Sequence, residues 1–278
     1  MAENAVQAQY RQEFIAGFEQ RQSLVRHTVT TEVEIKGSTA VFLVADSGDA
    51  TAVTRGLNGL IPARADDLNQ YTATLVEWHD LVRRTRFNIF TSQGDGRRIM
   101  QETTMGVLNR RIDQDIITEL NDSGNTQDTG ATATASLDMV MYGLTILGNN
   151  SVYNDGNISA LITPAFHAYL MQTKEFASAD YVNNKPFSGQ PMSYQWAGVN
   201  FIVHPNLPGK TTSAEKCFMY HRNAMGHAHD AGTVDVAVDY DKEQDYSFAR
   251  ASGYFGSKTL QTSGIVVMNH DGSKYAAQ

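Results

Sequence analysis

The first apolar pattern along the chain is helical and lies at its N-terminus. Val6, Tyr10, Phe14 and Phe18 recur at helical spacing among glutamate and glutamine residues, which predicts an amphipathic helix over residues 3–26. An apolar stripe at a chain terminus needs a surface that covers it. Either the same domain or a neighbouring subunit would cover Phe14 and Phe18, and the sequence leaves both possibilities open.

Alternating residues then predict extended structure and a long loop. The β-branched alternation of residues 28–35 predicts one strand, and the apolar run 41–44 predicts a second. Residues 47–69 contain several glycines and a proline, which is typical of turns and loops. We expect the tip of this loop to supply interface residues, namely Leu57, Leu60 and Ile61.

Residues 71–90 alternate over an unusual length. Apolar and polar side chains occur on both faces, whereas a strand in a compact core would separate them. This pattern favours a ribbon that reaches away from its own domain. A ribbon of two strands is only marginally stable in water, so it needs a partner surface, and Trp78 is its interface candidate.

Residues 96–121 are predicted to form the longest helix. One face carries an apolar stripe made of Met105, Leu108, Ile112, Ile116 and Leu120. At a rise of about 1.5 Å per residue this helix would be roughly 39 Å long, well above the average for globular domains. Its opposite face carries Arg97, Arg110 and Arg111.

The pattern changes after the polar stretch 122–136, which is the best candidate for a domain boundary. Ser136 can cap a helix whose apolar face carries Leu137, Val140, Met141, Leu144 and Leu147. Thr163 followed by Pro164 predicts another helix start, with the helix running to residue 172. Short strands are predicted near residues 158–162, 199–203, 216–220, 233–238, 246–255 and 264–268.

This order of elements resembles the major capsid protein of tailed bacteriophages, which has the Hong Kong 97-type fold. In that family an N-terminal arm, a long two-stranded loop, one very long helix and a mixed α/β half follow one another. The stretches that carry the resemblance are ISALITPAFHAYLM (158–171), WAGVNFIVHPNLP (196–208), CFMYHRNAMG (217–226) and RASGYFGSKTLQTSGIVVM (250–268). The resemblance covers residues 3–270.

The resemblance implies an α+β protein with five parts. They are an N-terminal arm (1–27), an extended β-hairpin loop with peripheral-domain strands (28–90), the spine helix of the peripheral domain (91–125), a mainly axial domain (126–245) and closing strands that return to the peripheral domain (246–278). The implied function is self-assembly through pentamers and hexamers into an icosahedral head shell. The shell would enclose double-stranded DNA without reading its sequence.

Further partners follow from the same resemblance. We expect a portal protein, whereas the presence of a decoration protein or a scaffolding protein stays open. Because no scaffold-like extension precedes the arm, any scaffold would be a separate protein. An encapsulin-type nanocompartment shares this fold and encloses protein cargo instead of DNA, so it stays open as an alternative.

The composition agrees with a soluble virion protein assembled in a bacterial cytoplasm. The formal net charge of −8 argues against a free-standing DNA-binding protein with a basic surface. The single cysteine, Cys217, cannot form an internal disulfide and most simply lies in the core. The sequence shows no signal peptide, and its apolar runs are too short to span a membrane.

Nothing in the sequence assigns a catalytic or cofactor-binding residue. His227 and His229, with His221 and Asp230 nearby, allow a distant alternative, a metal-dependent enzyme. Polar histidines at a tip or an interface are the simpler interpretation. The stretch 94–98 precedes a helix and is interpreted as a tight turn with an aspartate cap.

A short acidic run alternates along the chain at Asp239, Asp241, Glu243 and Asp245. It lacks the glycine and the final glutamate of a calcium-binding loop, so we expect a solvated or subunit-facing acidic edge. Pairing of this edge with the basic helix region of a neighbouring subunit is one hypothesis, with Asp239, Asp241, Arg110 and Arg111 as candidates. Contact of the arginines with packaged DNA is the rival hypothesis.

Overall fold

The computed structural model describes residues 20–32, 35, 37–47, 50–63, 67–85, 96–123, 126–127, 133–152, 155–174, 193–230 and 235–275. These residues form two compact units. Unit 1 takes its described residues from Met1–Ser23, Glu77–Ile112 and Asp230–Tyr254, and unit 2 from Leu24–Val76, Asp113–His229 and Phe255–Gln278. Helix α2 (Gly96–Asn121) and strand β12 (Tyr246–Thr259) each contribute residues to both units.

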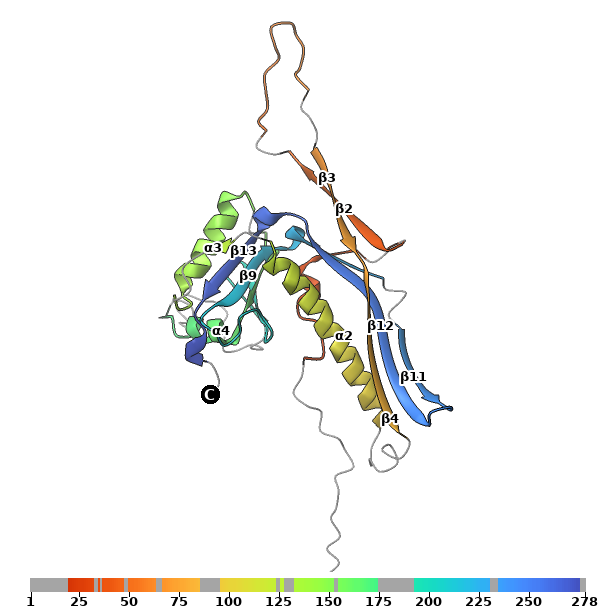
Figure 1. Cartoon of the computed structure of the whole chain (residues 1–278). Helices are drawn as coiled ribbons and strands as arrows, with labels where there is room; N and C mark the ends of the chain where they lie inside the picture. The colour runs from red at the N-terminus through yellow and green to blue at the C-terminus, as the bar shows by residue number, and fades with distance from the viewer. Residues whose placement is uncertain are drawn as a thin grey trace, which may run out of the picture. The chain divides into compact units, whose positions relative to one another are not determined.

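Unit 1 combines a small sheet with the first part of α2. Strand β12 pairs antiparallel with β11 (Asp235–Asp241) and also pairs with β4 (Val76–Thr85). The buried positions of β12 in this unit are small residues: Ser247, Ala249, Ala251, Ser252 and Gly253. Trp78 of β4 lies under Arg111 of α2, so the sheet and the helix pack together (Figure 1).

Unit 2 is built around a six-stranded mixed sheet with the order β5-β13-β9-β6-β8-β7. The strands are β5 (Thr126–Gln127), β6 (Ile158–Ile162), β7 (Ser193–Trp196), β8 (Val199–Val203), β9 (Glu215–His221) and β13 (Ile265–His270). Every residue of β6 is buried. A run that is apolar at almost every position therefore marks a strand that is covered on both faces.

Helices α3 (Leu137–Asn149) and α4 (Pro164–Leu170) cover one face of this sheet (Figure 1). Gly143 of α3 lets the helix approach Met219, and the Phe166 ring of α4 meets His270 edge to face at 5.0 Å between ring centroids. On the other face, Lys216 Nζ donates to Asn121 Oδ1 at 2.8 Å, at the end of α2. The short 3-10 helix η1 (Arg26–Thr28) also lies on that face, where Thr28 and Tyr220 share a hydrogen bond.

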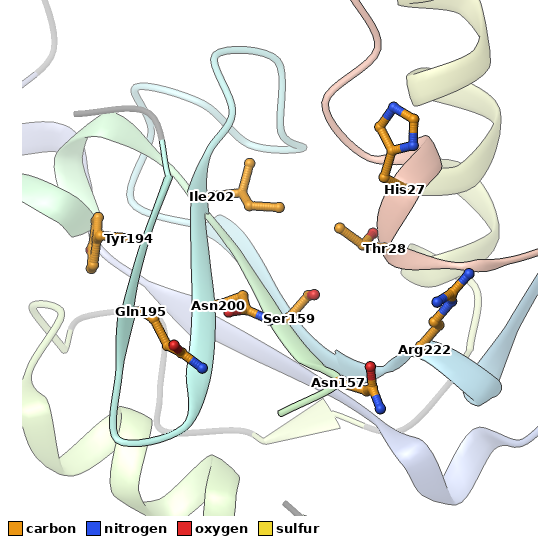
Figure 2. Close-up of a pocket in the computed structure, with 9 residues that line it drawn as sticks. All are labelled: His27, Thr28, Asn157, Ser159, Tyr194, Gln195, Asn200, Ile202 and Arg222. Carbon is orange, nitrogen blue, oxygen red and sulfur yellow. The ribbon is translucent and has the colours of Figure 1, made fainter. Parts of the chain in front are cut away.

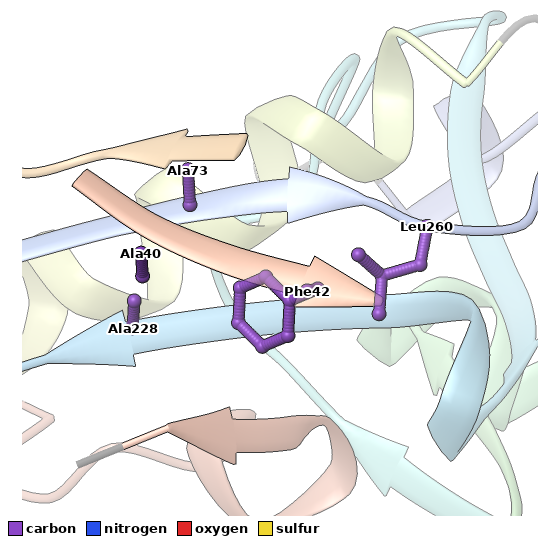
Figure 3. Close-up of a cluster of buried hydrophobic side chains, with 5 residues drawn as sticks. All are labelled: Ala40, Phe42, Ala73, Ala228 and Leu260. Atoms are coloured by element: carbon purple, nitrogen blue, oxygen red, sulfur yellow. The ribbon is translucent and has the colours of Figure 1, made fainter. Parts of the chain in front are cut away.

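A hairpin extends from the same unit. Strands β2 (Thr39–Asp46) and β3 (Asp67–Thr74) pair antiparallel, and β1 (Thr30–Glu32) pairs parallel with β10 (Met225–His229), which in turn pairs with β12. A cluster of buried side chains anchors the hairpin at its base: Ala40, Phe42, Ala73, Ala228 and Leu260 (Figure 3). The hairpin is thus fastened at one end only among the described residues.

The remaining short elements are 3-10 turns. They are η2 (Arg222–Ala224), η3 (Thr262–Gly264) and η4 (Ser273–Tyr275). In the part of the chain that the structure describes, no helix is both long and apolar enough to cross a membrane.

The predictions for α2, α3, α4 and most later strands are confirmed. Helix α2 has the predicted bounds, and its stripe is buried at Leu108, Ile112, Ile116 and Leu120, with Met105 half-buried. Ser136 caps α3 through its side chain, and Thr163 caps α4, which ends at Leu170 rather than at residue 172. In α3 the predicted stripe is wrong at Met141, which is 47% exposed, whereas Met139 and Gly143 are buried.

Two predictions for the first third of the chain need correction. The helix predicted over residues 3–26 lies outside the described residues up to residue 19, and residues 20–25 are not helical. The carbonyl oxygens of Gln20 and Arg21 instead accept hydrogen bonds from the side chains of Arg110 and Asn109. These bonds satisfy backbone groups that a helix would otherwise satisfy internally.

The continuous ribbon predicted over residues 71–90 is also wrong. The chain divides at Leu75 into β3, which pairs with β2, and β4, which pairs with β12. The backbone N–H of Leu75 donates to the carbonyl of Ser38 at 2.9 Å and closes the hairpin there. The reaching ribbon is therefore β2–β3, and Trp78 is not part of it.

Candidate subunit interface

The β2–β3 hairpin carries an apolar face that no described residue of the chain covers. In the antiparallel register Leu43 lies opposite Gln70 and Ala45 lies opposite Leu68, so Val41, Leu43 and Leu68 share one face. Leu43 is 66% exposed and Leu68 is 63% exposed. The opposite face holds Phe42, which is buried at the base of the hairpin.

The loop that joins the two strands extends this apolar surface. All described residues from 50 to 63 are exposed, and Leu57, Leu60 and Ile61 are among the most exposed apolar side chains. A turn shapes the tip, because Gly56 N–H donates to the Leu60 carbonyl at 3.1 Å and Gly59 has a φ of 72°. We call the set Val41, Leu43, Leu57, Leu60, Ile61 and Leu68 the hairpin patch.

The predicted basic and aromatic candidates form contacts inside unit 1. The Arg111 guanidinium lies 3.7 Å from the centre of the Trp78 ring, a cation–π contact. Arg110 Nη1 donates to the Gln20 carbonyl at 3.1 Å. These side chains fasten β4 and the segment around Gln20 to α2, and their predicted role between subunits stays a prediction.

The acidic candidates lie on β11 and the turn after it. Asp239 is exposed and Asp241 is half-buried. Asp241 Oδ1 accepts hydrogen bonds from the N–H groups of Glu243 and Gln244, which lower the pKa of its carboxyl. Strand β11 ends the described path of its sheet, and charged residues on such an edge oppose pairing with a foreign strand.

The histidines considered for a metal site are buried, which corrects the expectation of a polar tip or interface. His227 and His229 lie in β10, an inner strand between β1 and β12, and their rings stack with 5.7 Å between centroids. His227 Nδ1 lies 3.0 Å from Ser257 Oγ, and His229 Nε2 contacts Arg26. Among the described residues no group of three or more His, Cys, Asp or Glu side chains is arranged so that it could hold a metal ion.

Two buried polar groups escaped the sequence reasoning because their members are far apart in sequence. Asp113 of α2 accepts the N–H groups of Leu24 and Val25, and His204 Nε2 lies 3.4 Å from its Oδ2. This bonding holds η1 against the end of α2. No local signal identifies such a pair, because Asp113 appears in sequence as one of several polar residues of a helix and His204 as a polar residue after a strand.

The second group is Cys217, His270 and Glu215. His270 Nε2 lies 3.0 Å from Glu215 Oε2, and His270 Nδ1 lies 3.8 Å from Cys217 Sγ. The contacts run from Cys217 through His270 to Glu215, in the order of a nucleophile, a base and an acid. All three side chains are buried, however. Burial raises the pKa of the Cys217 thiol to about 12, so it is not a thiolate at neutral pH. The prediction of Cys217 as a core residue is confirmed.

The structure also contains a pocket of about 380 Å³ in unit 2 (Figure 2). One wall is formed by η1 and by Arg222, the first residue of η2. The opposite wall is formed by strands β6, β7 and β8.

Other predicted elements lie outside the described residues, including Phe14, Phe18 and the turn at 94–95.

This architecture is that of the Hong Kong 97-type capsid proteins. A chain of Mycobacterium phage Che8 has a TM-score of 0.76 at 17% identity, covering 96% of this chain and 98% of that one. The capsid structure of the cyanophage P-SCSP1u has a TM-score of 0.74 at 12% identity, covering 95% and 93%. The capsid of a native gene transfer agent (GTA) particle has a TM-score of 0.68 at 13% identity, covering 96% and 96%. No curated protein matches the chain.

The chain belongs to the phage capsid protein family, whose model matches residues 2–271. It is therefore a structural protein of a capsid, and the predicted fold class is confirmed. Nothing in the structure or in these likenesses favours a metal-dependent enzyme.

Proposed function

We propose that this chain is the repeated subunit of an icosahedral head shell that encloses the double-stranded DNA of a tailed phage. Assembly takes place in the host cytoplasm around a portal, and the chain itself performs no catalysis. The observation that carries the proposal is the hairpin patch, an apolar surface on an extended element with no intramolecular cover among the described residues.

The energetics of the patch favour association with a neighbouring subunit. Full burial of one leucine or isoleucine side chain contributes about 1.5–3 kcal/mol. Several such side chains on each subunit would make the patch a dominant part of one contact. Head-to-tail contacts of this kind close into rings, and closure adds stability without requiring each contact to be tight.

The test is a pair of matched loop variants. Leu57→Asp removes an exposed apolar side chain and adds a charge, while Asn58→Asp adds the same charge at the next position and removes no apolar group. Both residues are exposed, so both variants should fold like the wild type. Size-exclusion chromatography and negative-stain electron microscopy then measure the fraction of subunits in shells.

We expect the wild type and Asn58→Asp to form closed shells, or free pentamers and hexamers, and Leu57→Asp to remain largely unassembled. A wild type that stays monomeric, including after expression with its neighbouring genes, would overturn the shell function. Equal assembly of both variants would reject the patch as the contact and leave the shell function standing. Nuclease protection of DNA inside purified shells tests their content, and enclosed protein would favour the nanocompartment.

A further inference from the structure

The pocket of Figure 2 lies over strands β6, β7 and β8 of the six-stranded sheet of unit 2, between them and η1. Helices α3 and α4 cover one face of the sheet, and η1 and the end of α2 contact β9 on the other face. Ser159 of β6 pairs in register with Asn200 of β8, which lies opposite Gln195 of β7. These three side chains line the pocket, so this edge of the sheet is not packed under η1.

The lining of the pocket both donates and accepts hydrogen bonds. Asn157 Nδ2 donates to Asp155 Oδ2 at 2.9 Å, and Asn200 Nδ2 donates to the Gly156 carbonyl at 2.9 Å. Each amide therefore keeps its side-chain oxygen as an acceptor. The Ser159 hydroxyl can donate or accept a hydrogen bond. A ligand that fits must bring donors as well as acceptors.

Arg222 is the only residue of the lining with a permanent charge, and the lining contains no carboxylate. Its side chain is exposed, and within the described part of the chain its guanidinium has no hydrogen bond or ion pair. Asp155 contacts His221, the residue before Arg222, with 3.2 Å between its Oδ1 and His221 Nε2, and it also accepts hydrogen bonds from Asn157. The pocket thus presents an uncompensated guanidinium beside neutral polar groups.

We propose that this pocket receives an acidic side chain, with the polypeptide backbone beside it, from a second copy of the chain. This proposal rests on the shell function proposed above. The carboxylate binds the Arg222 guanidinium, and backbone N–H groups of the incoming segment donate to the oxygens of Asn157 and Asn200. A second copy carries 30 Asp and Glu residues against 22 Lys and Arg residues, so it can supply a carboxylate that is complementary in charge to this single arginine.

The observations favour a protein segment over DNA. Phosphate oxygens only accept hydrogen bonds, so a DNA backbone would leave the oxygens of Asn157 and Asn200 without donors. Non-specific DNA binding also depends on several cations that act together, whereas this lining holds a single arginine.

The first experiment places a reactive amine in the pocket. Arg222→Lys keeps the charge, and a water-soluble carbodiimide joins the lysine amine to a carboxylate in contact with it. An amide forms, and the carbodiimide takes up the water and becomes a urea. Shells assembled from a mixture of ¹⁵N-labelled and unlabelled subunits are cross-linked and digested. A link between subunits then appears as peptide pairs of mixed label.

A matched control checks the chemistry. Arg250 Nη2 lies 3.0 Å from Asp235 Oδ2 of the same chain, so Arg250→Lys should give a link to Asp235 without mixed label. We expect position 222 to give mixed-label links to an acidic residue. Links from position 222 only to Asp155 of the same chain would overturn the proposal. So would the absence of any link while the control link forms.

The second experiment measures assembly directly. Arg222→Gln should raise the threshold subunit concentration for shell formation about two- to fivefold, as for the loss of one exposed ion pair per contact. Arg222→Glu should raise it more than about tenfold, because two carboxylates would meet. Circular dichroism checks that both variants fold.

An unchanged threshold for Arg222→Glu would refute the proposal, even though the wild type forms shells. Shells of Arg222→Gln that form at the wild-type threshold but hold less nucleic acid would also refute it, and would assign the pocket to DNA phosphate. A wild type that never assembles is a different result, because it rejects the shell function itself.

Discussion

His227 should make the folded chain less stable in mild acid. Its side chain is fully buried, and burial, helped by the nearby His229 and Arg26, lowers its pKa from 6.5 to about 3. Asp113 acts in the opposite direction but does not outweigh burial. The imidazole therefore stays neutral inside the protein at pH values where an exposed histidine takes up a proton.

The direction and size of the effect follow from this difference. In the unfolded chain His227 binds a proton as the pH falls below 6.5, while in the folded chain it does not. Its stabilising contribution is complete above pH 6.5 and decreases by about 1.4 kcal/mol for each pH unit below that, until about pH 3. Two pH units thus remove about 2.7 kcal/mol, a large part of the roughly 5–15 kcal/mol typical of folded proteins.

The assay is urea unfolding of the unassembled full-length chain at several pH values between about 4.5 and 7.5, followed by tryptophan fluorescence. His227→Asn keeps a polar group beside Ser257 and cannot titrate. We expect its free energy of unfolding to vary less steeply with pH, by about 1.4 kcal/mol per unit. Equal slopes for the wild type and His227→Asn would refute the claim that burial holds His227 neutral.

Three further variants test single contacts. A Cβ on Gly256 would lie 2.2 Å from the Thr74 carbonyl oxygen, so Gly256→Ala should push the base of the hairpin away and destabilise the chain by about 1–3 kcal/mol in urea unfolding. Unchanged stability would contradict this close packing. Arg111→Ala removes the cation over Trp78 and should cost about 0.5–2 kcal/mol, with a change in tryptophan fluorescence that a merely exposed arginine would not cause. Ser136→Ala removes the cap of α3 and should lower the melting temperature by a few degrees, equivalent to about 1 kcal/mol, whereas Ser136→Asp, which can also cap, should restore it.

Local patterns determined α2, α3, α4 and most of the later strands. The stripe of α2 and the caps at Ser136 and Thr163 depend on residues within one or two turns, so the sequence shows them directly. Strand β6 was predicted from its short apolar run, and the structure shows that all of its residues are buried. The order of these elements carried the resemblance to a capsid protein, and the family match supports it.

Some interface candidates could be placed from local sequence, whereas the surroundings of others depend on residues far away in the chain. The loop residues Leu57, Leu60 and Ile61 are exposed where the glycines and the proline predict a loop tip. Trp78 looked like a residue of the reaching ribbon, but its environment depends on Arg111, which is distant in sequence. The Arg222 pocket was not predicted, because its lining comes from elements spread between residues 27 and 222.

The sequence by itself determined α2, α3 and α4, the position of most later strands, where the polar loop lies and which family the chain resembles. The helices, strands and loop depend on side-chain spacing within about ten to twenty residues, and the resemblance depends on the order of these elements. Only the tertiary structure decided that the alternating run breaks at Leu75 into two sheets, that His227 and His229 are core residues, and that Asp113 fastens η1. A side chain's burial and partners depend on which strands become neighbours, and strand pairing across a long chain leaves no mark in local spacing.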